Sequence, residues 1–305
     1  MVNEDEDTAV DLSHLRPAAQ QIARLPDAER LRFVRADRWI GYPRATEALG
    51  RLETLLSWPS KQRMPNLLLI GPTNNGKSMI VEKFRRGHPP VSYPDREEIP
   101  VLVVQMPSEP SVIRFYTALL AALGAPLRAR YRVADLEQAV LRLLRAAEVR
   151  VLVIDELHNV LGGSGDKRRE FLNLLRYLGN ELRIPLVGVG TRDAYLAIRA
   201  DDQLENRFAP LTLARWDADV DACSLLASFA ASFPLRRASP IATAEMAGYL
   251  LTRSEGTIGE LAHLLTDAAV AAIESGEEAI NQRTLLLAPY VGPTERRRLF
   301  ERELT

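Results

Sequence analysis

The chain has 305 residues, and its 39 Lys and Arg against 40 Asp and Glu give a formal net charge of −1. Apolar residues make up 47%, enough for a sizeable core, but no apolar run approaches membrane-spanning length and the N-terminus is acidic, unlike a signal peptide. We therefore expect a cytoplasmic protein without membrane association. The single cysteine, Cys223, excludes an internal disulfide and a Cys-based zinc site, and nucleic-acid binding would require a local basic patch.

The N-terminal part of the chain is expected to be helical, and a sheet is expected after it. After an acidic tail, short helical patterns at 17–25 and 27–37 precede a longer one at 44–56, whose apolar residues recur at helical spacing. Five apolar runs, alternating with helical patterns, then predict a parallel α/β sheet covered on both faces. These strands are expected at 67–70, 101–105, 151–154, 184–189 and, shorter, 211–213.

From 216 onward the pattern is helical only, which predicts a small α-helical lid. The expected division is an acidic tail with a helical extension, the α/β core, the lid and a charged tail. These four parts are 1–38, 39–215, 216–290 and 291–305.

The strongest motif is a phosphate-binding loop, G-x-x-x-x-G-K-[ST], directly after the first apolar run. Its glycines let the chain wrap tightly, so backbone N–H groups and the next helix's N-terminus face the phosphates. Lys77 can reach the β- and γ-phosphates of ATP, and the Ser78 hydroxyl can bind Mg²⁺. A plain Gly/Asn turn is the alternative. The expected ATP-binding residues are Gly71, Pro72, Thr73, Asn74, Asn75, Gly76, Lys77 and Ser78.

Two carboxylates follow the apolar run at 151–154, at the end of a parallel strand where ligands bind in open α/β sheets. Asp155 is placed to hold Mg²⁺ through its water shell, and Glu156 to polarise the attacking water. A solvated helix start is the alternative for such a pair taken alone. Together with the phosphate loop, the pair predicts ATP hydrolysis.

Two further polar residues follow later strands. Thr191 lies after the run at 184–189, where it could contact the attacking water or the phosphate; the alternative is a helix N-cap. Arg207 is either an exposed charge or an arginine finger, as in ring and filament ATPases, where an arginine at this point projects into the next subunit's site.

These motifs and their flanks resemble the TniB family of transposition AAA+ ATPases, related to TnsC, MuB and IstB. The resemblance rests on the segments 63–78, 153–159 and 203–208, with 39–45 and 255–261 fitting the same pattern. It implies an AAA+ P-loop core with a five-stranded parallel sheet and a small helical lid.

The family also implies a function. Its members are ATP- and Mg²⁺-dependent, DNA-binding regulators that oligomerise on target DNA, as rings or helical filaments, and recruit or activate a transposase. The implied partners are double-stranded DNA, a transposase of the D,D,E integrase type and, as a further candidate, a target-selection protein. Hydrolysis would control assembly, and the protein would not itself cut or join DNA.

The lid departs from the wider AAA+ pattern, because Gly259 stands where many lids carry an arginine that touches the γ-phosphate. The adenine site is expected at Ile40, Tyr42 and Pro43, by analogy with the family, and packing at a domain edge is the alternative. His158 is interpreted as a residue at a helix start.

DNA contact is expected at Arg128, Arg130 and Arg132, which flank Tyr131 in a basic stretch whose alternate arginines could meet successive phosphates. A solvated loop without a partner is the alternative. The basic cluster at 296–298 is offset by nearby glutamates, and a protein-binding tail is the better interpretation there.

Two other functions share these motifs. A helicase loader or replication initiator has the same core but recruits a helicase, and a STAND-type switch uses nucleotide for conformational control. No repeat or receptor domain follows the lid, which argues against the switch. The phosphate-loop sequence and the segment 203–208 favour transposition over helicase loading.

Overall fold

The computed structural model describes residues 11–126 and 132–304. The chain falls into two compact units. One is formed by Arg44–Ala214, and the other combines Met1–Pro43 with Arg215–Thr305. The N-terminal extension and the C-terminal helices therefore belong to one unit, which we call the helical unit, and the α/β core forms the other.

The core contains a five-stranded sheet in the order β4-β5-β6-β1-β7, and every neighbouring pair is parallel. This confirms the expected AAA+ fold class. The strands are β1 (Asn66–Ile70), β4 (Val101–Gln105), β5 (Val151–Asp155), β6 (Leu186–Gly190) and β7 (Phe208–Thr212).

The strand β7 begins three residues before the predicted start at 211. Pro210 lies within it, opposite Leu68 of β1, and a proline argues against a strand when only the sequence is read. The position tolerates it because β7 is the last strand in the sheet order, so no further strand needs the missing N–H.

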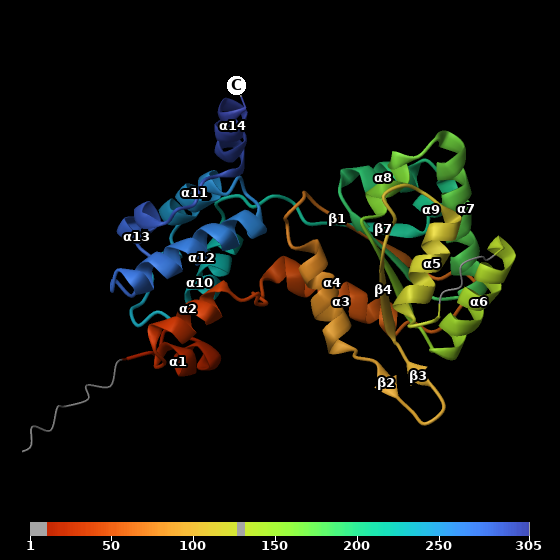
Figure 1. The fold of residues 1–305 in the computed structure, drawn as a ribbon, viewed down its shortest axis with the longest axis horizontal. Helices are drawn as coiled ribbons and strands as arrows, with labels where there is room; N and C mark the ends of the chain where they lie inside the picture. Colours follow the sequence, from red (N-terminus) through yellow and green to blue (C-terminus); the bar gives the residue numbers. More distant parts are fainter. Residues whose placement is uncertain (1–10, 127–131, 305) are drawn as a thin grey trace, which may run out of the picture. The chain divides into compact units, whose positions relative to one another are not determined.

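Helices cover both faces of this sheet, with α3 (Pro43–Leu56) and α4 (Lys77–Gly87) on one side (Figure 1). The opposite face packs against a larger group, and alternate strand residues such as Leu68, Ile70, Leu152 and Ile154 form a core with it. Because side chains alternate along a strand, both faces are buried and the strands read as continuous apolar runs. The group comprises α5 (Val112–Ala122), α6 (Val133–Ala146), η1 (Leu157–Gly162), α7 (Gly165–Leu182), α8 (Arg192–Arg199) and α9 (Asp202–Glu205).

A small antiparallel hairpin, β2 (Val91–Ser92) with β3 (Glu97–Glu98), was not predicted. Its two-residue strands are largely exposed and carry no apolar alternation, so no periodic signal marks them.

The helical unit contains two N-terminal and five C-terminal helices among its described residues. They are α1 (Pro17–Ala23), α2 (Asp27–Arg35), α10 (Val220–Ala230), α11 (Ala244–Arg253), α12 (Ile258–Glu274), α13 (Gln282–Leu287) and α14 (Pro293–Glu303). Gly259 lies in the first turn of α12. Within the described ranges, no helix combines the length and apolar character needed to cross a bilayer.

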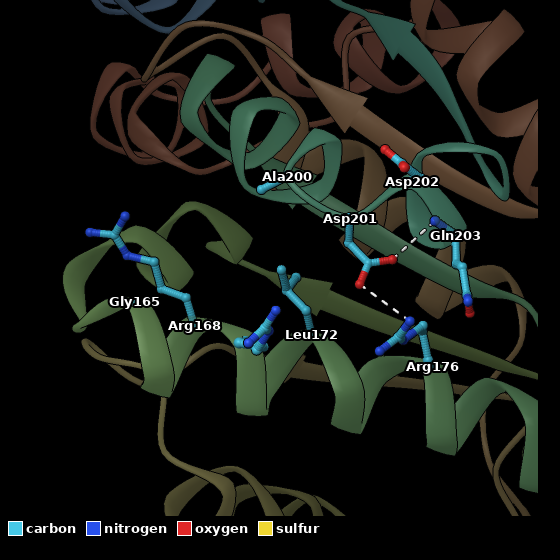
Figure 2. A pocket seen from close by; sticks show the side chains of 9 residues that line it. Gly165, Arg168, Leu172, Arg176, Ala200, Asp201, Asp202 and Gln203 are labelled. Atoms are coloured by element: carbon cyan, nitrogen blue, oxygen red, sulfur yellow. Dashed lines mark hydrogen bonds and ion pairs between the residues drawn. The ribbon is translucent and has the colours of Figure 1, made fainter.

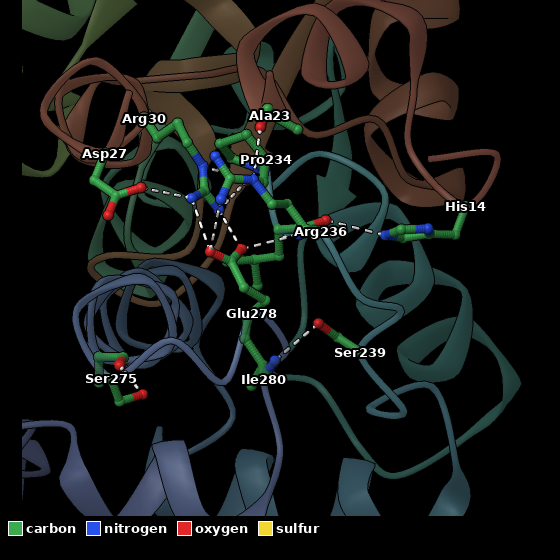
Figure 3. Close-up of polar contacts among 12 residues, drawn as sticks. His14, Ala23, Asp27, Arg30, Pro234, Arg236, Ser239, Ser275, Glu278 and Ile280 are labelled. Carbon is green, nitrogen blue, oxygen red and sulfur yellow. Dashed lines mark hydrogen bonds and ion pairs between the residues drawn. The ribbon is translucent and has the colours of Figure 1, made fainter. Parts of the chain in front are cut away.

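A buried ion pair joins the N-terminal and C-terminal parts of this unit (Figure 3). The Arg30 side chain of α2 is fully buried, and its Nη1 donates to Glu278 at 2.8 Å and to Asp27 at 2.9 Å. Its Nε and Nη2 both donate to the Pro234 carbonyl, at 3.1 and 2.9 Å, and Nη2 also pairs with Glu278. The buried guanidinium thus has partners for all three of its nitrogens.

Candidate functional site

The phosphate-binding loop leaves β1 at Gly71, whose N–H donates to the Gly190 carbonyl at the end of β6. A Cβ on Gly71 would lie 2.7 Å from the Leu213 carbonyl oxygen, closer than real Cβ atoms approach backbone. Gly76, the N-cap of α4, has φ +82°, a left-handed conformation that favours glycine. Both glycines of the motif are therefore required by the backbone.

Asn75 holds the same loop against the chain after β7. Its side-chain amide donates to the carbonyls of Leu213 and Ala214, at 2.8 and 3.0 Å, and only 2% of the residue is exposed. The motif allows any residue at this position, so no sequence signal marks its anchoring role.

Lys77 lies at the start of α4 and is only 7% exposed. Its Nζ donates to the carbonyls of Gly71 and Pro72, at 2.9 and 2.6 Å, so the ammonium lies in the curve of the loop. Burial lowers the pKa of Lys77, while the nearby Asp155 and Glu156 act in the opposite direction.

Ser78, in the first turn of α4, lies beside Asp155, the last residue of β5. The Ser78 hydroxyl donates to Asp155 Oδ2 at 2.8 Å, and Asp155 Oδ1 accepts from the Glu156 N–H at 2.8 Å. A hydroxyl beside a carboxylate is a hard-oxygen donor set of the kind that Mg²⁺ uses next to nucleotide phosphates. These two residues, predicted separately, fit a magnesium ion.

Glu156 has φ +56°, a left-handed conformation that is uncommon for a glutamate. Its carboxylate is 3.2 Å from His158 Nε2, while His158 Nδ1 is buried and has no hydrogen-bond partner within the described residues. His158 lies in the first turn of η1, as interpreted from the sequence, but its contact with Glu156 was not predicted.

Thr191 is the N-cap of α8, and its side chain makes no capping hydrogen bond. It directly follows β6, which lies between β5 and β1 in the sheet. Thr191 therefore lies at the carboxyl ends of the strands, as the phosphate loop and the two carboxylates do. Its side chain does not cap the helix.

Arg207 lies at the other end of the sheet. It precedes β7, whose first residue Phe208 pairs with Asn66, the first residue of β1, while the phosphate loop follows the last residue of β1. A five-residue strand spans roughly 16 Å, farther than an arginine side chain reaches. The structure therefore does not bring Arg207 to the phosphate loop of its own core.

The remaining predicted residues lie elsewhere. Ile40, Tyr42 and Pro43 belong to the helical unit, where Ile40 and Tyr42 are each 7% exposed and the Tyr42 ring packs edge-on against Trp216 at 5.2 Å. Arg132 is the exposed N-cap of α6.

Two predicted DNA-binding residues, Arg128 and Arg130, fall outside the described residues. The DNA-binding role of these two residues and of Arg132 stays a prediction, as does the adenine site.

These features define the class of the protein, which is an AAA+ P-loop ATPase. They are the order of the parallel strands, the phosphate loop with its two required glycines, and the carboxylates at the strands' carboxyl ends. The family described as "Bacterial TniB protein" matches residues 30–218, well over half of the chain. The chain belongs to the TniB family. A comparison with curated proteins found no match.

Several solved structures have a similar fold. They include Cdc6p from Pyrobaculum aerophilum (TM-score 0.56, 17% identity, covering 84% of this chain and 68% of that one). The Aeropyrum pernix ORC1 protein in complex with DNA is similar at TM-score 0.53, with 17% identity over 85% of this chain and 68% of that one. The Walker-type ATPase paby2304 of Pyrococcus abyssi also has TM-score 0.53, with 14% identity over 84% and 76%.

Proposed function

We propose that this protein is an ATP-dependent, DNA-binding transposition regulator that oligomerises on target DNA and recruits or activates a transposase. Membership of the TniB family supports the biological role. One structural observation carries the mechanism. The phosphate loop and carboxylates lie at the carboxyl ends of the strands and Arg207 lies at their amino ends, which supports a site that Arg207 completes in a neighbouring copy.

ATP binding uses the loop at 71–78. Lys77 exchanges its bonds to the Gly71 and Pro72 carbonyls for phosphate oxygens, which carry more charge and so bind the ammonium more strongly. Ser78 Oγ and Asp155 Oδ2, which lie 2.8 Å apart, would hold Mg²⁺ directly or through its waters, and a bound Mg²⁺ would supply positive charge beside the phosphates.

Hydrolysis uses Glu156 and Thr191. Glu156 takes the proton of the attacking water, and the contact with His158 restricts the directions in which its carboxylate can point. Thr191, at the end of β6, offers a hydroxyl to the same water or to the γ-phosphate. Gly259, in the first turn of α12, itself offers no cation to this step.

Arg207 completes the site of a neighbouring copy. There it neutralises negative charge that develops on the transferred phosphoryl group. ATP bound between two copies then stabilises their contact, and hydrolysis of the ATP weakens it. The assembly of copies therefore depends on the bound nucleotide. This is the reason to expect a ring or helical filament.

DNA binding rests on Arg128, Arg130 and Arg132, which would contact backbone phosphates with little sequence preference. The A. pernix ORC1 protein, similar in fold, was solved in complex with DNA. Its likeness also keeps a replication-initiator or helicase-loader role as the second candidate. Membership of the TniB family favours transposition.

Electron microscopy of the protein on duplex DNA tests this proposal. With a non-hydrolysable ATP analogue we expect regular oligomers on the DNA, and with no nucleotide we expect few or none. A D,D,E transposase from the same genetic element should co-sediment with these complexes. Monomers under every condition, or recruitment of a helicase in place of the transposase, would contradict the proposal.

A further inference from the structure

A positively charged pocket lies beside Arg207, at the end of the sheet where the parallel strands begin. This cavity, which we call the amino-edge pocket, has a volume of about 470 Å³. Its lining contains three cationic and two amide side chains and no carboxylate. The residues are Lys61, Arg63, Met64, Pro65, Gln203, Asn206 and Arg207.

The pairing of β1 with β7 builds this pocket. Asn66 pairs with Phe208, and the Asn66 N–H donates to the Arg207 carbonyl at 3.0 Å. The segments that precede these two strands therefore run side by side. One brings Lys61 and Arg63, and the other brings Arg207, although the two segments are more than a hundred residues apart in the sequence.

The positive charges of the pocket are not neutralised by acids. Arg207 Nη1 donates to the amide oxygen of Asn180 at 2.9 Å, and Lys61 Nζ lies 4.9 Å from the centre of the Trp58 ring. Both contacts fix a cation without cancelling its charge. Arg63 is exposed and has no carboxylate within salt-bridge range among the residues described here.

A neighbouring pocket shows the opposite arrangement (Figure 2). It also contains arginines, from α7, but Asp201 and Asp202 line it as well, and Arg176 Nη1 lies 3.4 Å from Asp201 Oδ2. Its charge is therefore partly balanced within the chain. Of these two adjoining pockets, the amino-edge pocket is the one whose lining calls for an anion from outside.

We propose that the amino-edge pocket binds the polyphosphate of a nucleoside triphosphate held by a neighbouring copy, with Lys61 and Arg63 acting beside Arg207. This inference rests on the proposed function, and it adds two cations to the site completed in trans. Asn180 is a positioning residue, because its amide oxygen holds the Arg207 guanidinium without neutralising it.

A triphosphate suits the pocket better than duplex DNA does. It carries several negative charges on a few adjacent atoms, which matches three cations gathered around one cavity. A DNA strand instead presents one phosphate per about 3.4 Å of helix axis, which is matched by cations spaced along a track.

The test is the double variant K61Q/R63Q, which removes both charges and leaves Arg207 in place. R142Q/R150Q is the matched control, since it removes two exposed arginines from the region around β5, away from the β1–β7 edge. ATP affinity is measured on dilute single subunits, and hydrolysis and assembly on the concentrated protein. Mixtures of K61Q/R63Q with E156Q subunits are assayed as well.

We expect unchanged ATP affinity in K61Q/R63Q, hydrolysis lowered on the order of tenfold or more, and partial recovery on mixing with E156Q. Parent-level hydrolysis and assembly in K61Q/R63Q, alongside their loss in R207A, would overturn this inference and leave the proposed function standing. Weakened DNA binding with normal hydrolysis would assign the pocket to DNA instead. A parent protein that neither hydrolyses ATP nor assembles would overturn both.

Discussion

At the scale of single residues, Lys77 illustrates how a buried charge is kept ready for a ligand. Its ammonium has two carbonyl partners in the loop, so burial does not leave it unsatisfied, yet neither partner carries a charge. A phosphate can therefore replace them with a gain in free energy.

Lys77→Ala should weaken ATP binding by about 3 kcal/mol, roughly a hundredfold, because it removes the charge that faces the phosphates. Isothermal titration of the purified variant measures this. Lys83→Ala, an exposed lysine on the same helix, is the control and should bind as the parent does. Equal ATP affinity in Lys77→Ala and the parent would rule out the phosphate-loop assignment.

Glu156→Gln should bind ATP normally and lose hydrolysis by roughly 10²- to 10⁴-fold, because the amide keeps the shape and cannot accept the proton. Complexes on DNA should persist, since the ATP state is not consumed. A phosphate-release assay measures the rate, with the exposed Glu47→Gln as control. Hydrolysis at the parent rate would show that Glu156 is not the base.

At the scale of elements, the sequence predicted what depends on local pattern. Four of the five strands fell within two residues of their observed bounds, because buried parallel strands form short apolar runs. The start of β7 was missed at Pro210, where the edge position of the strand outweighs its local propensity. The β2–β3 hairpin has no apolar pattern at all.

For the site, too, the sequence predicts only what lies in a contiguous stretch of residues. The loop at 71–78 and the pair Asp155 and Glu156 are contiguous motifs, so they can be read directly from the sequence. Arg207 is hydrogen-bonded to Asn180, and Asn75 to Leu213, although the two residues of each pair are far apart in the sequence. Such contacts depend on how strands and helices come together, and no local pattern encodes them.

The ion pair between α2 and the segment before α13 gives a prediction for the helical unit. Arg30→Met should destabilise this unit by about 3–5 kcal/mol, because Glu278, which is 13% exposed, is left without its main partner. The double variant R30M/E278L should recover much of the loss, since no buried charge remains unpaired.

Urea unfolding followed by circular dichroism measures these free energies. Arg35→Met is the matched control on the same helix, because the pair with Glu274 is long, at 3.8 Å, and exposed. It should change stability by at most about 1 kcal/mol. Equal losses in Arg30→Met and Arg35→Met would show that the buried pair contributes no more than the exposed one.

At the scale of the whole molecule, the parallel sheet separates two functions. The strands' carboxyl ends carry the groups to which we assign ATP binding and hydrolysis, and their amino ends carry Arg207 and the amino-edge pocket. β1 and β7 are paired along their whole length, and this pairing keeps the two ends of the sheet apart within one core. If Arg207 acts on ATP, it therefore acts in a site shared between two copies.

The most direct test of that claim is a mixing experiment with Arg207→Ala and Glu156→Gln. Each variant alone should bind ATP and hydrolyse it poorly. In mixed oligomers, the intact Glu156 of one copy can meet the intact Arg207 of another, so part of the activity should return. No recovery of hydrolysis, with co-assembly of the two variants demonstrated, would contradict sites shared between copies.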